Sequence, residues 1–188
     1  MAPKDNTNHN PHPDPEPDPH PAPRAPAMLA VETAAQVATV ADLAREIWQE
    51  HYAAIIGQAQ VDYMLDNVQS AAAIAQQMRQ GYRYFMVMDG GQPCGYIALV
   101  ADAAAGSMLL SKIYVRRAGR GRGLGRLALA FAEEQCRQGG CRVLWLTVNK
   151  HNPTLDWYRR RGFVCTEELV QDIGGGFVMD DYRMEKRV

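Results

Sequence analysis

The sequence SKIYVRRAGRGRGLGR, residues 111–126, decides the interpretation of the whole chain. The stretch from Met108 to Val115 is apolar and β-prone, which predicts a strand, and a helix is predicted to begin at about Gly123. The residues around this junction are three alternating glycines and five arginines: Gly121, Gly123, Gly125, Arg116, Arg117, Arg120, Arg122 and Arg126. Glycines let backbone N–H groups converge on an anion, and a helix N-terminus adds a positive dipole end. The stretch therefore predicts a polyphosphate site.

Two common phosphate-binding motifs do not fit this loop. A P-loop requires Lys-Ser/Thr after its last glycine, whereas Gly125 is followed by Arg126 and Leu127. The dinucleotide fingerprint G-x-G-x-x-G differs from the G-x-G-x-G found here, and no acidic residue ends a second strand about 20 residues later. Arg120-x-x-Gly123-x-Gly125 after a strand that ends in valine instead resembles the pyrophosphate-binding signature of the GNAT superfamily of acyl-CoA N-acyltransferases. A basic turn at the start of an ordinary helix is the alternative interpretation.

A second motif strengthens this resemblance. The segment NKHNPTLDWYRRRGF, Asn149–Phe163, is similar to the second GNAT motif, in which a strand and an asparagine precede a short helix with a tyrosine and then Gly-Phe. Asn152 and Tyr158 are six positions apart, whereas many members have seven. The closing segment, residues 172–184, resembles a bacterial subgroup that includes polyamine-type acetyltransferases. With the preceding hairpins, the resemblance covers residues 29–188.

The resemblance implies where acetyl-CoA, the cosubstrate, would bind. In the family, the strand before the loop splays from the next one and pairs its backbone with the pantetheine arm, while the loop amides hold the pyrophosphate. Arg120 is the arginine favoured for the phosphates, and Asn152 would hydrogen-bond the pantetheine or fix its own loop. The implied cofactor-binding residues are Ile113, Tyr114, Val115, Arg120, Gly121, Arg122, Gly123, Leu124, Gly125, Arg126 and Asn152. No metal is implied.

Acetyl transfer to an amine needs a neutral nitrogen, a stabilised oxyanion and a proton for the departing thiolate. The resemblance implies that the backbone N–H of Val115 binds the oxyanion and that Tyr158 is the catalytic residue that protonates the coenzyme sulfur. The alternative for Tyr158 is an aromatic residue packed beside Trp157. Many relatives carry a glutamate in the strand that here reads LSKI, residues 110–113, which has no carboxylate. The base is therefore expected to be bulk water or a water polarised by one of four residues: His51, Ser111, Asp180 and Asp181.

The hydrophobic periodicity predicts the order of the elements. The predicted helices span residues 36–55, 62–67, 71–80 and 123–138, and the predicted strands span 29–33, 82–89, 94–101, 107–115 and 142–148. The crossover rule makes strands 107–115 and 142–148 parallel. We expect an α/β fold: a single GNAT-like domain whose mixed, mainly antiparallel, twisted sheet is flanked by helices, with splayed parallel strands at the acyl-CoA site. Four aromatic or imidazole side chains could line a substrate pocket or pack at the rim of the core: Trp48, His51, Tyr52 and Tyr63.

Composition limits the remaining classes. The chain has 188 residues and a formal net charge of −1, which gives no overall attraction to nucleic acid or membrane. Residues 1–27 alternate proline with polar residues and are predicted to be a disordered tail, so the domain is placed at 28–188. The N-terminus does not resemble a signal peptide and no apolar run reaches membrane-spanning length, which predicts a cytoplasmic protein. The four cysteines form no C-x-x-C pair, so we expect reduced thiols and no zinc site.

We therefore expect acetyl transfer from acetyl-CoA to a primary amine by direct attack in a ternary complex. A catalytically silent acyl-CoA sensor is the first alternative. A nucleic-acid-binding module that uses arginines 116–126 is the second, although the cluster lacks interleaved aromatic residues. Acidic residues near the C-terminus would suit a polyamine, and peptides, amino sugars and amino acids stay open as acceptors. The family resemblance also implies a homodimer formed through the last strands.

Overall fold

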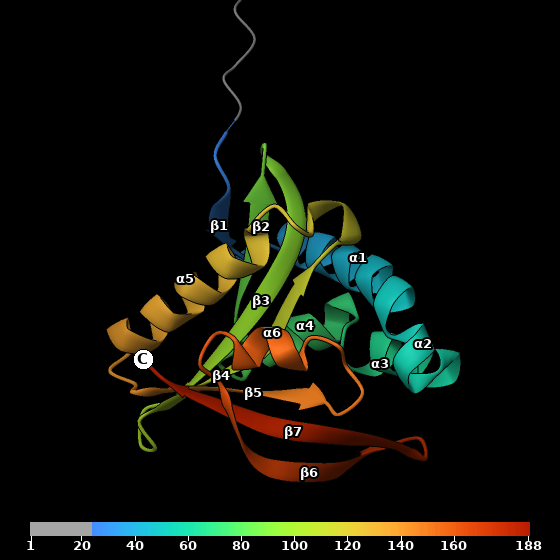
Figure 1. The fold of residues 1–188 in the computed structure, drawn as a ribbon. Coiled ribbons are helices and arrows are strands. Elements are labelled where there is room, and N and C mark those ends of the chain that lie inside the picture. The colour runs from blue at the N-terminus through green and yellow to red at the C-terminus, as the bar shows by residue number, and fades with distance from the viewer. Residues whose placement is uncertain (1–23) are drawn as a thin grey trace, which may run out of the picture.

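The structure is a computed structural model that describes residues 24–188; residues 1–23, which hold most of the predicted tail, lie outside the described residues. Within the described chain, one mixed sheet has the strand order β1-β2-β3-β4-β5-β7-β6 (Figure 1). The strands are β1 (Ala27–Ala30), β2 (Arg83–Asp89), β3 (Gln92–Asp102), β4 (Ser107–Val115), β5 (Val143–Asn149), β6 (Val164–Gly174) and β7 (Phe177–Arg187). The helices are α1 (Ala34–His51), α2 (Ala53–Ile56), α3 (Gln58–Asn67), α4 (Ala71–Arg79), α5 (Leu124–Gln138) and α6 (Leu155–Arg159). The predicted fold class is confirmed.

The first predicted helix, 36–55, is divided in the structure. It begins at Ala34 because Thr33 forms a capping box with Gln36: Thr33 Oγ1 accepts the Gln36 N–H at 3.2 Å, and Gln36 Oε1 accepts the Thr33 N–H at 2.9 Å. It ends at His51, and Tyr52 is both the C-cap of α1 and the N-cap of α2. Tyr52 therefore lies at the junction of the two helices, and its own backbone stays helical, with φ −92° and ψ −20°.

Both faces of the sheet are covered. Helix α5 lies against one face, and α1, α3 and α4 lie against the other (Figure 1). Strand β2 shows the consequence, because Tyr84, Phe85, Met86 and Val87 are all buried although successive side chains point to opposite faces. The two apolar cores therefore meet through β2 and β3, and they hold the sheet firmly on both sides of the site described below.

Strands β4 and β5 separate soon after they meet. They run parallel, as predicted, but pair only over residues 107–109 of β4 and 143–145 of β5. Beyond this short ladder, the β4 edge that faces β5 has no strand partner. A bulge in the β3–β4 pairing also leaves Ser111 without an opposite residue, because Leu99 pairs with Leu110 and Ala98 pairs with Lys112. The bulge reverses the side-chain alternation, so Leu110 packs in the core on the α5 side and Lys112 projects on the α1–α4 side.

The β6–β7 hairpin closes one side of this opening by contacting α3. Tyr63 donates its hydroxyl to the Ile173 carbonyl at 2.7 Å, and Gln60 Nε2 donates to the Val178 carbonyl at 3.0 Å. These contacts join residues that are more than 100 positions apart in the sequence.

Among residues 24–188, no helix is long and apolar enough to cross a membrane. The same residues contain no cluster of three His, Cys, Asp or Glu side chains arranged to hold a metal ion.

Candidate active site

The glycine loop leads into the N-terminus of α5 in a conformation that suits an anion. Gly121 and Gly123 adopt positive φ angles of 79° and 85°, which side-chain-bearing residues rarely adopt. Gly123 is the N-cap and supplies no side-chain oxygen, so the first N–H groups of α5 are not capped by a side chain. Gly125 lies beside Trp157, since a Cβ there would be in van der Waals contact with Trp157 Cζ2 at 3.4 Å. The uncapped N–H groups and the helix dipole can hold a pyrophosphate.

The arginines around the loop have different partners. Arg120 donates from Nε to the Val115 carbonyl at 3.2 Å, which holds its guanidinium beside the end of β4. Arg122 instead forms a 2.7 Å ion pair with Asp89, and Arg116 forms a 3.1 Å ion pair with Glu46. Arg120 is thus held at the end of β4, whereas Arg122 is engaged by a carboxylate at the end of β2.

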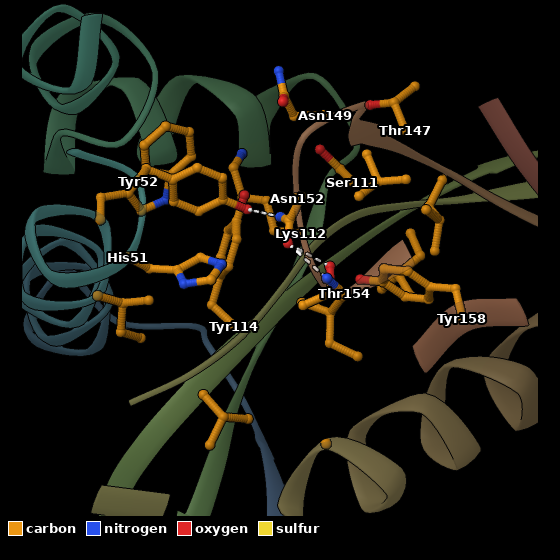
Figure 2. Close-up of a pocket in the computed structure, with 18 of the residues that line it drawn as sticks. His51, Tyr52, Ser111, Lys112, Tyr114, Thr147, Asn149, Asn152, Thr154 and Tyr158 are labelled. Atoms are coloured by element: carbon orange, nitrogen blue, oxygen red, sulfur yellow. Dashed lines mark hydrogen bonds between the residues drawn. The ribbon is translucent and has the colours of Figure 1, made fainter. Parts of the chain in front are cut away.

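A cavity of about 1030 Å³, called the central cavity below, extends from the glycine loop to the β6–β7 hairpin. Figure 2 shows part of its lining, with Lys112, Asn152 and Tyr158 among the labelled residues. Of the residues predicted to bind the cofactor, all except Arg122 line it. Tyr158 lines it too. At the far end, the walls come from α3, α4, β5 and the β6–β7 hairpin, with lining residues Met64, Gln77, Thr147, Gln171, Ile173 and Met179. One continuous space therefore joins the predicted phosphate loop to a chamber on the opposite side of the β4–β5 gap.

The free edge of β4 offers backbone groups to this cavity. The N–H of Arg116 donates to the Cys94 carbonyl on β3 at 2.9 Å. Because backbone groups alternate between the two edges of a strand, the N–H groups of Val115 and Ile113 face away from β3, toward the gap. The Val115 carbonyl agrees with this direction, since it accepts the hydrogen bond from Arg120. An extended ligand could pair with this edge as an added strand does.

Tyr158 is held by α6 with its ring in the core and its hydroxyl in the cavity. The ring packs edge-on against Trp157 and Phe163, at centroid distances of 5.1 and 5.7 Å, and the residue is 8% exposed. No hydrogen bond joins its hydroxyl to another described residue. Burial raises the pKa of Tyr158 well above its ordinary value, so the phenol stays protonated near neutral pH. Tyr158 is therefore a packed aromatic residue whose hydroxyl is protonated and lies in the cavity.

Asn152 fixes the turn that precedes α6. Its Oδ1 accepts hydrogen bonds from the Thr154 N–H at 2.9 Å and the Thr154 hydroxyl at 2.8 Å, and its Nδ2 donates to the Tyr52 hydroxyl at 3.3 Å (Figure 2). Of the two roles proposed for Asn152, fixing the loop is the one with visible hydrogen bonds. The contact with Tyr52 joins the junction of α1 and α2 to the turn before α6, across the cavity.

The aromatic residues predicted near a substrate pocket divide into two groups. Trp48 and Tyr52 are stacked at 4.4 Å, and both line the cavity together with His51. Trp48 is only 2% exposed, so it belongs to the core as well as to the cavity wall. Tyr63 is not part of the lining and holds the hairpin through Ile173. Three of the four side chains thus line the central cavity, and Trp48 packs in the core as well.

Asp181 has the most distinctive environment of the residues considered as bases. It is 5% exposed, it lines the cavity, and its Oδ1 has no hydrogen-bond partner among the described residues. Burial raises its pKa to about 6, against the opposing effect of a hydrogen bond from Thr147. Asp180 forms a 2.7 Å ion pair with Lys150 outside the cavity lining. His51 and Ser111 line the cavity, and burial lowers the pKa of His51.

Lys112 is a site residue that the sequence interpretation did not select. It is 5% exposed and lines the cavity, and its Nζ lies 2.6 Å from both Gln77 Oε1 and Tyr84 Oη. Burial lowers its pKa to about 7. The only signal in the sequence was a lysine inside an otherwise apolar strand, and its direction depends on the bulge at Ser111.

Comparison with known proteins identifies the family. The family model described as Acetyltransferase (GNAT) family matches residues 40–163. An uncharacterized N-acetyltransferase from the pepI 3′ region of Lactobacillus delbrueckii subsp. lactis is 35% identical over 98 residues, a match that covers 48% of this chain and 56% of that protein. The PaiA N-acetyltransferase of Thermoplasma acidophilum, solved in complex with coenzyme A, is 20% identical with a TM-score of 0.70, covering 88% of this chain and 100% of that one.

A further similar structure is that of yncA from Salmonella typhimurium, solved with its cofactor acetyl-CoA. It is 20% identical with a TM-score of 0.59 and covers 87% of this chain and 94% of that one. At these identities, the two solved structures support the fold. The family match spans both the glycine loop and the Asn152–Tyr158 segment on which the resemblance was based. The chain therefore belongs to the GNAT family of acetyltransferases.

Proposed function

We propose that the protein transfers the acetyl group of acetyl-CoA to a primary amine by direct attack in a ternary complex. The observation that carries this proposal is the continuity of the central cavity, which joins an uncapped helix N-terminus, an unpaired strand edge and a buried carboxylate. The donor end fits a long phosphorylated cosubstrate, with the α5 amides and Arg120 at the pyrophosphate and the β4 edge along the pantetheine. Bound acetyl-CoA would supply the acetyl group as a reactive thioester.

Two groups on the chain would stabilise the transfer. The Val115 N–H faces the gap and can donate to the carbonyl oxygen as it gains negative charge. The Tyr158 hydroxyl can give its proton to the sulfur as the carbon–sulfur bond breaks, and the raised pKa supports this role because it keeps the phenol protonated. The products are the N-acetylated amine and the free coenzyme thiol.

Asp181 is the residue that we propose as the general base. An amine acceptor enters as an ammonium ion and must lose a proton before its nitrogen can attack. The free Oδ1 of Asp181 can take that proton directly or through one water. A carboxylate whose pKa is raised to about 6 is ionised at neutral pH and still a stronger base than an ordinary aspartate. It would replace the glutamate that β4 lacks.

The polyamine acceptor suggested by the closing segment stays one proposal among several. A polyamine would suit the five acidic residues near the C-terminus, which are Glu167, Glu168, Asp172, Asp180 and Asp181. Of these five, only Asp181 lines the central cavity. A polyamine carries several positive charges and is best held by several carboxylates. The described lining therefore favours a smaller amine with a single ammonium group.

The proposal is tested by release of free coenzyme thiol from acetyl-CoA in the presence of single amines, with mass spectrometry of the acetylated product. The panel contains spermidine, amino acids, an aminoglycoside and short peptides. Turnover with one class of amine supports the proposal. Tight acetyl-CoA binding without turnover on any amine supports the sensor, and steeply salt-dependent binding of duplex DNA supports the nucleic-acid alternative.

We also propose a homodimer formed through the last strands. Strand β6 is at the edge of the sheet, and Val164, Val170 and Val178 on the β6–β7 hairpin are 61%, 72% and 47% exposed. An edge strand with exposed apolar side chains favours pairing with another chain. Light scattering coupled to size-exclusion chromatography tests this directly, since a monomer at tens of micromolar would contradict it.

A further inference from the structure

Lys112 is a buried ionisable side chain without a counter-ion. Both of its hydrogen-bond partners, Gln77 Oε1 and Tyr84 Oη, are neutral, and no carboxylate among the described residues forms an ion pair with it. A lysine ammonium has three N–H donors, so at least one is left after these two bonds. An uncompensated buried cation is costly, which the lowered pKa of Lys112 reflects. A bound anion would relieve this cost.

The partners of Lys112 are themselves fixed in direction. Gln77 donates from Nε2 to the Val68 carbonyl at 2.9 Å, which turns its Oε1 toward Lys112 and toward the Tyr84 hydroxyl. The ammonium also lies 5.5 Å from the centre of the Tyr82 ring and 5.1 Å from that of Tyr84. Lys112 is thus held in one place on the cavity wall by α4 and β2, rather than left as a mobile surface side chain.

The second buried ionisable group on the same cavity is Asp181, whose Oδ1 has no hydrogen-bond partner among the described residues. Lys112 lies on the α1–α4 side of β4 because of the bulge, and Asp181 is paired with Asn149 on the neighbouring β5–β7 ladder. The two charges stand on opposite sides of the β4–β5 gap and are of opposite sign. A molecule that carries both an ammonium and a carboxylate would complement both of them.

The spacing of residues along β4 points in the same direction. The hairpin contacts to α3 close the side of the cavity near Ile173, and the rise of about 3.3 Å per strand residue sets the Lys112 backbone roughly 10 Å from that of Val115. Within such a distance a small molecule can reach from the reacting carbonyl to the lysine. We propose that the acceptor is a small amine that also carries a carboxylate group, of the amino-acid class, and that Lys112 determines this specificity by binding the carboxylate. This inference rests on the proposed acetyl transfer.

The test compares each acid with its own amide. The acceptors are alanine, β-alanine, 4-aminobutanoate and phenylalanine, each paired with the corresponding carboxamide, and spermidine is included as an amine without a carboxylate. The enzymes are the full chain, Lys112→Met, Lys112→Gln and Lys186→Met. The last is a control, because Lys186 pairs with Glu133 away from the cavity. Coenzyme release gives kcat and KM, calorimetry gives acetyl-CoA affinity, and circular dichroism verifies that each variant is folded.

We expect at least one acid to exceed its amide by tenfold or more in kcat/KM, mainly through KM. Lys112→Met and Lys112→Gln should lower this value at least tenfold more for the acid than for its amide, while Lys186→Met keeps the full preference. Equal use of acids and amides, or an equal loss for both in the Lys112 variants, would overturn the inference. Efficient transfer to spermidine alone would overturn it while the proposed function stands. Absence of transfer to every amine would remove both.

Discussion

Substitution of Tyr158 by phenylalanine should slow acetyl transfer without weakening acetyl-CoA binding. The change removes one hydroxyl that has no hydrogen-bond partner among the described residues, and it keeps the ring between Trp157 and Phe163. Stability should therefore change by less than about 1 kcal/mol, because no buried partner is left unsatisfied. The variant should melt within a few degrees of the wild-type chain, so an effect on rate can be assigned to the hydroxyl.

The expected loss follows from the chemistry of the leaving group. A general acid contributes about 10²- to 10⁴-fold to a rate. An ordinary thiol has a pKa of about 8.5, so its thiolate leaves with only partial assistance and the effect should lie near the lower limit. We expect kcat to fall about 100-fold, which corresponds to roughly 2.7 kcal/mol of activation free energy.

The assay is coenzyme release at saturating acetyl-CoA with the best amine of the panel, and calorimetry measures acetyl-CoA affinity in parallel. Tyr182→Phe serves as the matched control, because Tyr182 packs against the same core but does not line the cavity. A kcat within twofold of wild type would refute the role of the Tyr158 hydroxyl. A parallel loss of acetyl-CoA affinity would instead make it a binding group.

Three further substitutions test the other parts of the site. Asp181→Asn should lower kcat/KM about 100-fold. Because the carboxylate must be ionised to accept a proton, wild-type activity should rise with pH through about 6, and the variant should lose this rise. A rise that persists in the variant would exclude Asp181 as the base. Gly123→Ala should cost about 1–2 kcal/mol of stability, because the residue has a φ of 85°, and it should weaken acetyl-CoA binding. The control is Gly140→Ala, at a φ of 71° beyond the other end of α5, which should cost similar stability with no change in affinity. Arg120→Ala should weaken acetyl-CoA binding about 10- to 100-fold in calorimetry, as expected for the loss of one charge-assisted hydrogen bond. The guanidinium of Arg122 is held by Asp89, so an equal loss of affinity in Arg122→Ala would contradict this assignment.

The sequence predicted the elements whose signals are local. The strand before the glycine loop is predicted at residues 107–115, where β4 lies, because most of its residues are apolar and β-prone and a loop rich in arginine and glycine follows it. The parallel pairing of β4 with β5 followed from the handedness of the connection through α5. Eleven of the twelve predicted site residues line one cavity, since most come from two segments that the family motifs mark.

The remaining features depend on contacts between distant parts of the chain. The bulge at Ser111, which turns Lys112 toward α4, arises from the pairing of β4 with β3 and has no local sequence signal. The contact between Asn152 and Tyr52 joins residues 100 positions apart. The ion pair that engages Arg122 could not be predicted from the sequence, because only the fold brings Asp89 beside it. Asp181 differs from the other acidic residues near the C-terminus by its burial, which only the folded structure shows.

The most direct test of the central claim is calorimetric titration of the full chain with acetyl-CoA. The claim is that the glycine loop, the free edge of β4 and the gap between β4 and β5 form one acetyl-CoA site. It predicts saturable binding of one acetyl-CoA per chain, competed by free coenzyme A and weakened by Gly123→Ala but not by Gly140→Ala. No measurable binding at millimolar acetyl-CoA to the folded chain, or equal binding by both glycine variants, would contradict it.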